Sequence, residues 1–279
     1  MLARLELLKL VRSKRPWVAI SALVLFLALM LFGFYTYAQK ETGGQADFRY
    51  TFENSSYFNG LTFSLYAFYF GFVLVLPIFA ATEAGAQIAS ETHSRTIDLM
   101  LTRPLSRRSL FLAKSAISLS YLFLLVGGFL GLSLLLGLLA VGWGDLNIYP
   151  GVLQMTSQHQ FLPQSEALAR FLMVWPAATL GLLATLSLAL LLSSWVGNPV
   201  NAVGSSVAVY LVLYVVSEIH FFRDLRPWLF TSHLGYWRAL FQERIPWHQV
   251  AFEASMLAGF ACLFLALALY RFRSREEVG

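Results

Sequence analysis

Residues 91–114 read ETHSRTIDLMLTRPLSRRSLFLAK, a compact block of charges, hydroxyls and one proline between long apolar segments. The whole chain is 58% hydrophobic and only 13% charged over 279 residues, and its mean hydropathy is +0.64. Because soluble domains carry about 25% charged residues, this composition indicates a polytopic membrane protein. The block is therefore a water-facing stretch between two membrane spans.

The apolar segments are long enough to cross a membrane, which takes about 20 residues in a helix. The longest charge-free run, 171–217, exceeds one span, and Asn198 and Pro199 can divide it as a helix cap and a first helical residue. The sequence therefore predicts an all-α fold with six transmembrane helices in a single domain over 1–279. The predicted spans are 17–38, 61–82, 111–142, 168–194, 199–218 and 250–270, with a loop over 83–110 between the second and third.

The distribution of basic residues predicts the orientation of these spans. Thirteen of the 20 Lys and Arg residues lie in 1–16, in the loop with the start of the third span, or in the tail. Since basic residues concentrate on the cytoplasmic side, we expect both termini and the loop to be cytoplasmic, in a cell inner membrane. Residues 1–16 are predicted to form an interfacial helix. Basic residues at the ends of apolar runs indicate contact with anionic lipid headgroups rather than nucleic acid.

The segment before the last span, 218–253, is too polar to cross the membrane and too aromatic for a free linker. Amphipathic aromatic side chains are enriched at the level of the lipid headgroups. We therefore expect outer re-entrant or interfacial helices here, with Trp228, Tyr236 and Trp237 as a candidate outer gate. An ordinary interfacial aromatic belt is the alternative interpretation.

Within the opening block, an apolar stretch over 97–101 is followed by Arg103 and Pro104. Proline ends a helix because it lacks the backbone donor and restrains the preceding residue. The pattern predicts a short cytoplasmic helix that exposes charged and apolar side chains together, a combination suited to docking on a protein.

The same block resembles the loop between spans two and three of type-2 ATP-binding-cassette export permeases. The matching residues are Glu91, Thr96, Ile97, Asp98, Leu99 to Leu101, Thr102, Pro104, Leu105, Ser106, Arg107 and Lys114. Arg95 departs from the pattern, since that family has glycine there. The six-span plan and the aromatic outer segment resemble the family across the whole chain, in particular the permeases of nitrous-oxide-reductase maturation and gliding motility.

The resemblance implies a permease that forms a translocation pathway as a homodimer and binds two cytoplasmic ATPases. The loop would then act as a coupling helix that moves with the ATPases. ATP and magnesium would be bound by the ATPase partner, and this chain would hold no cofactor. The residues predicted to contact the ATPase are Glu91, Thr96, Asp98, Arg103, Pro104 and Arg107.

The sequence gives little support for ATP hydrolysis or metal binding by this chain. None of the lysines follows a glycine, so the chain lacks the Gly-Lys-Ser/Thr of a P-loop and is not expected to be an ATPase itself. The five histidines have no His-x-x-x-His pair and Cys262 is the single cysteine, so no metal site is predicted.

Two other function classes remain open, a secondary transporter and a non-transporting scaffold or assembly factor. Secondary transporters place ionisable residues within their spans, and the centres of the predicted spans hold none. Polar side chains that could line a pathway for an amphipathic substrate are Tyr66, Tyr69, Asn201, Ser205 and Tyr210. Gly127 with Gly131, and Ser133 with Gly137, give small-residue spacing in the third span and predict close packing, either within the chain or across a dimer.

Overall fold

The computed structural model describes residues 15–42, 58–94, 107–149, 153, 155 and 159–274. The predicted interfacial helix over 1–16 lies almost entirely outside these residues. Residues 95–106, the middle of the polar block 91–114, also lie outside them. The long helices are α2 (Arg15–Thr42), α3 (Gly60–Phe70), α4 (Leu76–His93), α6 (Arg107–Ala140), α7 (Gln164–Trp195), α8 (Pro199–Glu218) and α10 (Trp247–Ser274). The short elements are η1 (Gly71–Val75), β1 (Leu146–Ile148), β2 (Gln160–Leu162), η3 (His220–Phe222), η4 (Arg226–Trp228), α9 (Phe230–His233) and η5 (Leu234–Phe241).

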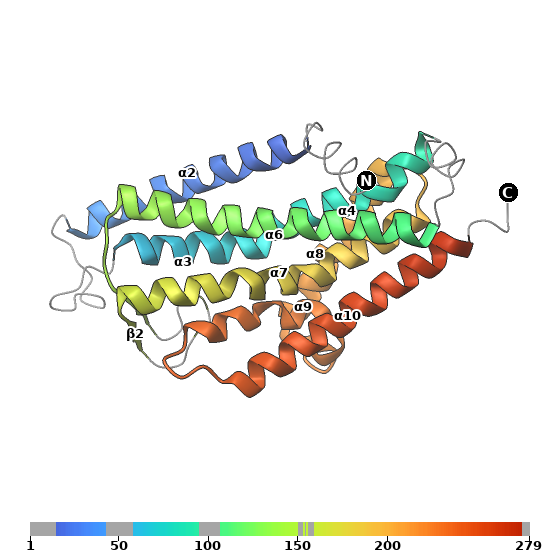
Figure 1. Ribbon diagram of the computed structural model, residues 1–279. Helices are drawn as coiled ribbons and strands as arrows, with labels where there is room; N and C mark the ends of the chain where they lie inside the picture. Colours follow the sequence, from blue (N-terminus) through green and yellow to red (C-terminus); the bar gives the residue numbers. More distant parts are fainter. Residues whose placement is uncertain are drawn as a thin grey trace.

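Six helical segments in the described part of the chain are long and apolar enough to cross a membrane, because α3, η1 and α4 form one continuous span. This confirms the predicted all-α polytopic fold. The start of α2, the end of α4, the start of α6 and the end of α10 lie at the same end of the bundle (Figure 1). We call this end the basic end, since Arg107, Arg108, Arg271 and Arg273 lie there, and the opposite end the hairpin end.

The bundle is organised around α7, which packs against α4, α6, α8 and α10. Helix α4 also packs along α8, and α3 packs along α6 (Figure 1). The turn between α7 and α8 forms as the sequence predicts, because Asn198 Oδ1 accepts from the backbone N–H of Val200 at 2.9 Å and Pro199 begins α8. Most of the buried apolar side chains of α3, α6 and α7 belong to one continuous core.

The second span differs from its predicted bounds. It was expected to end at residue 82, but α4 continues to His93, so the first part of the predicted 83–110 loop is helical. The extension holds Glu83, Gln87 and Glu91, which are all buried. Charged residues suggested the end of a span in the sequence, whereas in the fold they face neighbouring helices.

A π-helical turn, η1, interrupts this span at Gly71–Val75. Pro77 follows it and has no N–H to donate to the carbonyl of Val73 four residues earlier. The hydroxyl of Tyr210 in α8 donates to that carbonyl instead, at 2.8 Å. The irregular turn is therefore stabilised by a side chain from another span.

The hairpin end is closed by short elements. Strands β1 and β2 pair antiparallel with Leu146 opposite Leu162, and Asn59 Nδ2 donates to the carbonyl of Asp145 at 2.7 Å. After α8 ends, the segment from η3 to η5 packs against α7, α8 and α10 before the chain enters α10 (Figure 1). Outer helices before the last span were predicted, and short helices do occupy this stretch.

Candidate functional site

A buried ion pair joins α4 and α6, the two helices on either side of residues 95–106. Lys114 Nζ in α6 lies 2.7 Å from Glu91 Oε1 in α4, and these side chains are only 2% and 3% exposed. Removing either partner would leave the other charge buried, which is strongly unfavourable. The pair therefore fixes α4 and α6 to each other next to the ends of the block.

The helices around the Glu91–Lys114 ion pair are closely packed. Ser193 Oγ in α7 accepts from the backbone N–H groups of Ile88 and Ala89 at 3.1 and 3.0 Å. A Cβ added at Gly85 would lie 3.1 Å from the Cα of Val203 in α8, so only a small residue fits there. A separate apolar cluster joins α4, α6, α7 and α10, with Ile88, Leu110, Phe111, Leu191, Ala268 and Phe272. The part of α4 that holds Glu91 is therefore in close contact with α6, α7, α8 and α10.

The predicted ATPase-contact residues divide into three groups. Thr96, Asp98, Arg103 and Pro104 lie outside the described residues. Arg107 is the first residue of α6 and is half-buried. Glu91 was expected on the docking surface, but its carboxylate is buried against Lys114, so in this conformation it positions the helices and does not face a partner.

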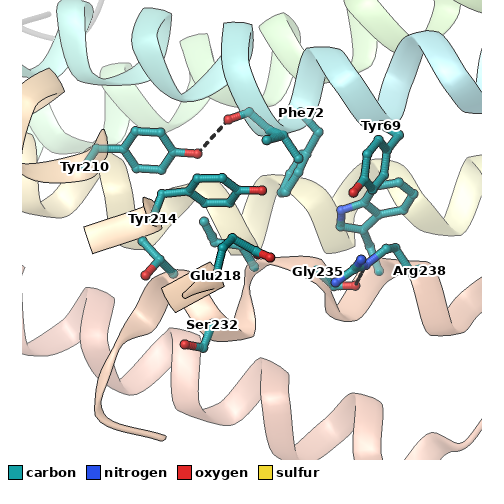
Figure 2. A pocket seen from close by; sticks show the side chains of 12 residues that line it. Tyr69, Phe72, Tyr210, Tyr214, Glu218, Ser232, Gly235 and Arg238 are labelled. Carbon is teal, nitrogen blue, oxygen red and sulfur yellow. Dashed lines mark hydrogen bonds between the residues drawn. The ribbon is translucent and has the colours of Figure 1, made fainter. Parts of the chain in front are cut away.

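A second polar site lies midway along the bundle, in a pocket between η1, α8 and the segment from η3 to η5 (Figure 2). About 420 Å³ of non-protein space lies within the pocket when the open solvent at its mouth is included, but the centre of a water-sized molecule can occupy only about 30 Å³ of it. Its lining consists of Tyr69, Phe72, Val73, Tyr210, Tyr214, Glu218, Thr231, Ser232, Leu234, Gly235, Trp237 and Arg238.

The pocket is lined by hydroxyls, a carboxylate, a guanidinium and an indole. In Figure 2 the phenol of Tyr214 and the carboxylate of Glu218 extend towards the space in front of Gly235 and Arg238. Arg238 is held by hydrogen bonds from Nε to the carbonyl of Gly235 at 3.0 Å and from Nη1 to that of Leu153 at 3.4 Å. Such an arrangement can bind a polar group that carries both charges.

The structure brings together three of the predicted pathway and gate residues, since Tyr69, Tyr210 and Trp237 all line this pocket. Asn201 and Ser205, which were also named as possible pathway residues, lie nearer the start of α8 at Pro199 and do not line this pocket. Tyr66 is half-buried in α3 and does not line the pocket.

The other two gate residues also lie apart from the pocket. Trp228 is 78% exposed, as expected for an interfacial aromatic. Tyr236 is buried and donates its hydroxyl to the carbonyl of Ala177 in α7 at 2.7 Å, and burial raises the pKa of this phenol. Tyr236 therefore fastens the outer segment to α7.

Sequence reasoning named Tyr214 among the polar residues of the spans but missed Glu218, Ser232 and Arg238 as pocket residues. One signal was available, because positions 210, 214 and 218 follow i, i+4 spacing and share a face of α8. The contributions of Ser232 and Arg238 depend on how the outer segment folds back on the bundle, and no local pattern predicts that.

Comparison with known families identifies the broader class. The sequence model of a family described as ABC-2 family transporter protein matches residues 2–162. The chain belongs to the ABC-2 transporter family. It is thus a multi-pass membrane permease of an ATP-binding-cassette transporter, and membership implies partnership with an ATP-binding-cassette ATPase. The match runs from the N-terminal region through the first three spans to β2 and includes the polar block 91–114. A search among curated proteins gives no match.

Proposed function

We propose that this ABC-2 permease forms the translocation pathway of an ATP-driven exporter. Separate cytoplasmic ATPases would bind ATP and magnesium and dock on the coupling block. Thr96, Asp98, Arg103, Pro104 and Arg107 would make that contact. The permease would work as a homodimer in the inner membrane, with both termini in the cytoplasm.

The observation that carries this proposal is the buried pair of Glu91 and Lys114 beneath the block. A docked ATPase that pulls on residues 95–106 would displace α4 and α6 as one unit. Because α4 packs against both α7 and α8, the movement would be passed to the pocket lined by α8 and η1. ATP binding could in this way change the access to the pathway.

Reversing the charge at Arg103 and Arg107 tests the coupling step. The double variant Arg103→Glu/Arg107→Glu should lose most of the ATPase stimulation that the permease gives its partner in lipid vesicles, while the permease still assembles as a dimer. Arg223→Glu, at an exposed arginine of the outer segment, is the matched control and should keep full stimulation. Unchanged stimulation in the double variant would remove the block from the mechanism.

A secondary transporter is the second candidate, and one buried residue favours it. Glu83 is 2% exposed in α4, and at 1.5 Å rise per residue it lies about 12 Å further into the bundle than Glu91. Buried carboxylates within spans are typical of proton- or ion-coupled transport. Glu83→Gln would abolish uptake or export driven by an ion gradient in vesicles without ATP, whereas an exporter driven by ATPases would show no such transport in either form.

A further inference from the structure

The pocket midway along the bundle contains a buried donor that has no acceptor in the described part of the chain. Trp237 is 1% exposed and lines the pocket, and its Nε1 has no hydrogen-bond partner among the residues that the structure describes. Ser232 Oγ is also buried and unpartnered within that part of the chain, but it points away from the other lining side chains (Figure 2). Because an unsatisfied buried polar group is costly, an acceptor oxygen placed beside Trp237 Nε1 would be favourable.

The charges around the pocket restrict the kind of molecule. Glu218 and Arg238 both line it, and neither forms an ion pair with another described residue. Both lie within electrostatic reach of Tyr214, as does Tyr69. A carboxylate and a guanidinium on one pocket complement a group that carries a cation and an anion. A guanidinium fits phosphate oxygens in particular, through parallel N–H donors.

The surface next to the pocket is apolar. Along the second span, Phe70 and Leu74 are exposed beside the pocket residues Tyr69 and Val73. Along α8, Val215 is exposed within one turn of Glu218. These side chains belong to membrane-spanning segments, so they offer a lipid-facing track for hydrocarbon chains that leads away from the polar site.

We infer that this pocket binds the headgroup of a zwitterionic phospholipid. The ammonium group lies against Glu218, the phosphate accepts from Arg238 and Trp237, and the acyl chains follow the apolar track. The inference deepens the proposed function by naming the substrate class, and it rests on that function only in treating the bound lipid as cargo.

Binding is measured on the purified full-length permease in detergent, without any ATPase, by native mass spectrometry with short-chain phosphatidylethanolamine and phosphatidylglycerol of identical chains. We expect phosphatidylethanolamine to bind about tenfold more tightly, because Glu218 favours an ammonium group and repels an anionic lipid. Glu218→Gln, at an exposed side chain, should erase this preference. Free phosphoethanolamine should bind far more weakly than the lipid, since it lacks the chains.

Two tryptophans of the outer segment provide a matched pair of variants. Trp237→Phe keeps an aromatic ring but removes the N–H, and should weaken phosphatidylethanolamine binding about fivefold to tenfold. Trp228→Phe makes the same chemical change at a 78% exposed side chain outside the pocket, and should leave binding unchanged.

The inference is overturned if the two lipids bind equally to the unmodified protein, if Glu218→Gln keeps the preference, or if both tryptophan variants weaken binding alike. Glu218 lies at the surface, so Glu218→Gln is expected to fold. Its lipid preference therefore tests the inference even if Trp237→Phe fails to fold. None of these results depends on ATP, so a failure here leaves the coupling test with Arg103 and Arg107 intact, and a failure of coupling leaves the binding result intact.

Discussion

At the basic end of the second span, Glu91 and Lys114 form a buried ion pair inside closely packed helices, whereas midway along the bundle Trp237 holds a buried N–H without a partner in the described fold. The first site joins two helices through charged side chains, and the second is a pocket with an open mouth. A buried contact between helices suits a part that transmits force, while an unpartnered donor at an open pocket suits a part that binds a ligand. The two regions therefore contribute differently to one transport cycle.

The largest expected effect comes from breaking the ion pair at the basic end. Lys114→Met should reduce the free energy of unfolding by about 3–5 kcal/mol, because it leaves the Glu91 carboxylate buried without its cation. The double variant Glu91→Met/Lys114→Met should recover most of that loss, since two apolar side chains need no partner. Thermal unfolding in detergent measures both, and equal losses in the single and double variants would show that the pair is not the stabilising feature.

Helix packing at the hairpin end is tested by two glycines of α6. A Cβ at Gly137 would lie 2.5 Å from the backbone of Gly60, where α3 and α6 touch, so Gly137→Ala should cost about 1–3 kcal/mol of unfolding free energy. Gly131→Ala is the control, because nothing lies within 4 Å of its Cβ position. That change should stabilise the helix by about 0.5–1 kcal/mol. Similar effects at both sites would contradict the close contact.

The link between the π-helical turn and α8 should have a smaller effect. Tyr210→Phe removes the donor to the Val73 carbonyl and should lower the free energy of unfolding by about 1 kcal/mol. Because Val73 lines the pocket, the same variant should also weaken lipid binding, whereas Gly137→Ala should not. Loss of stability with full binding would separate this turn from the pocket.

The smallest effect concerns Tyr236 and appears only at high pH. Burial raises the pKa of its phenol above the usual 10.0, so the folded state keeps the proton while the unfolded state releases it. Its contribution to stability is complete below pH 10 and declines as the pH rises above that value. Tyr236→Phe should make the alkaline loss of unfolding free energy shallower, measured by denaturation between neutral and alkaline pH. Tyr270→Phe, at an exposed side chain, should leave the profile as it is.

The sequence was sufficient for the regular parts of this architecture. Apolar length predicted the six spans, and Asn198 with Pro199 predicted the turn between α7 and α8, because caps and spans depend on local chemistry. The small residue Gly137 was correctly expected at a helix contact. The predicted end of the second span, at residue 82, was wrong. Glu83 and Glu91 were taken for solvent-facing residues, whereas they are buried by contacts with α6, α7 and α8.

The pocket shows the same limit of sequence reasoning. Tyr69, Tyr210 and Trp237 were named as pathway or gate candidates without any indication that they meet in one pocket, and Asn201 and Ser205, named with the pathway residues, lie towards the other end of α8. Spacing along a helix gives the face of a residue, while the depth at which another segment meets that face is set by tertiary packing. The fold of 219–246 over α8, which brings Arg238 and Ser232 to Tyr214, has no local signature.

The most direct test of the central claim is co-purification of the permease in mild detergent, with residues 95–106 intact or scrambled and with Glu91 and Lys114 unchanged in both. The scrambled form keeps the ion pair and should fold, so it isolates the docking surface from its anchor. We predict that an ATP-binding-cassette ATPase accompanies the intact form and is lost from the scrambled one. An ATPase that remains with the scrambled form, or an intact form that binds no ATPase, would contradict the account.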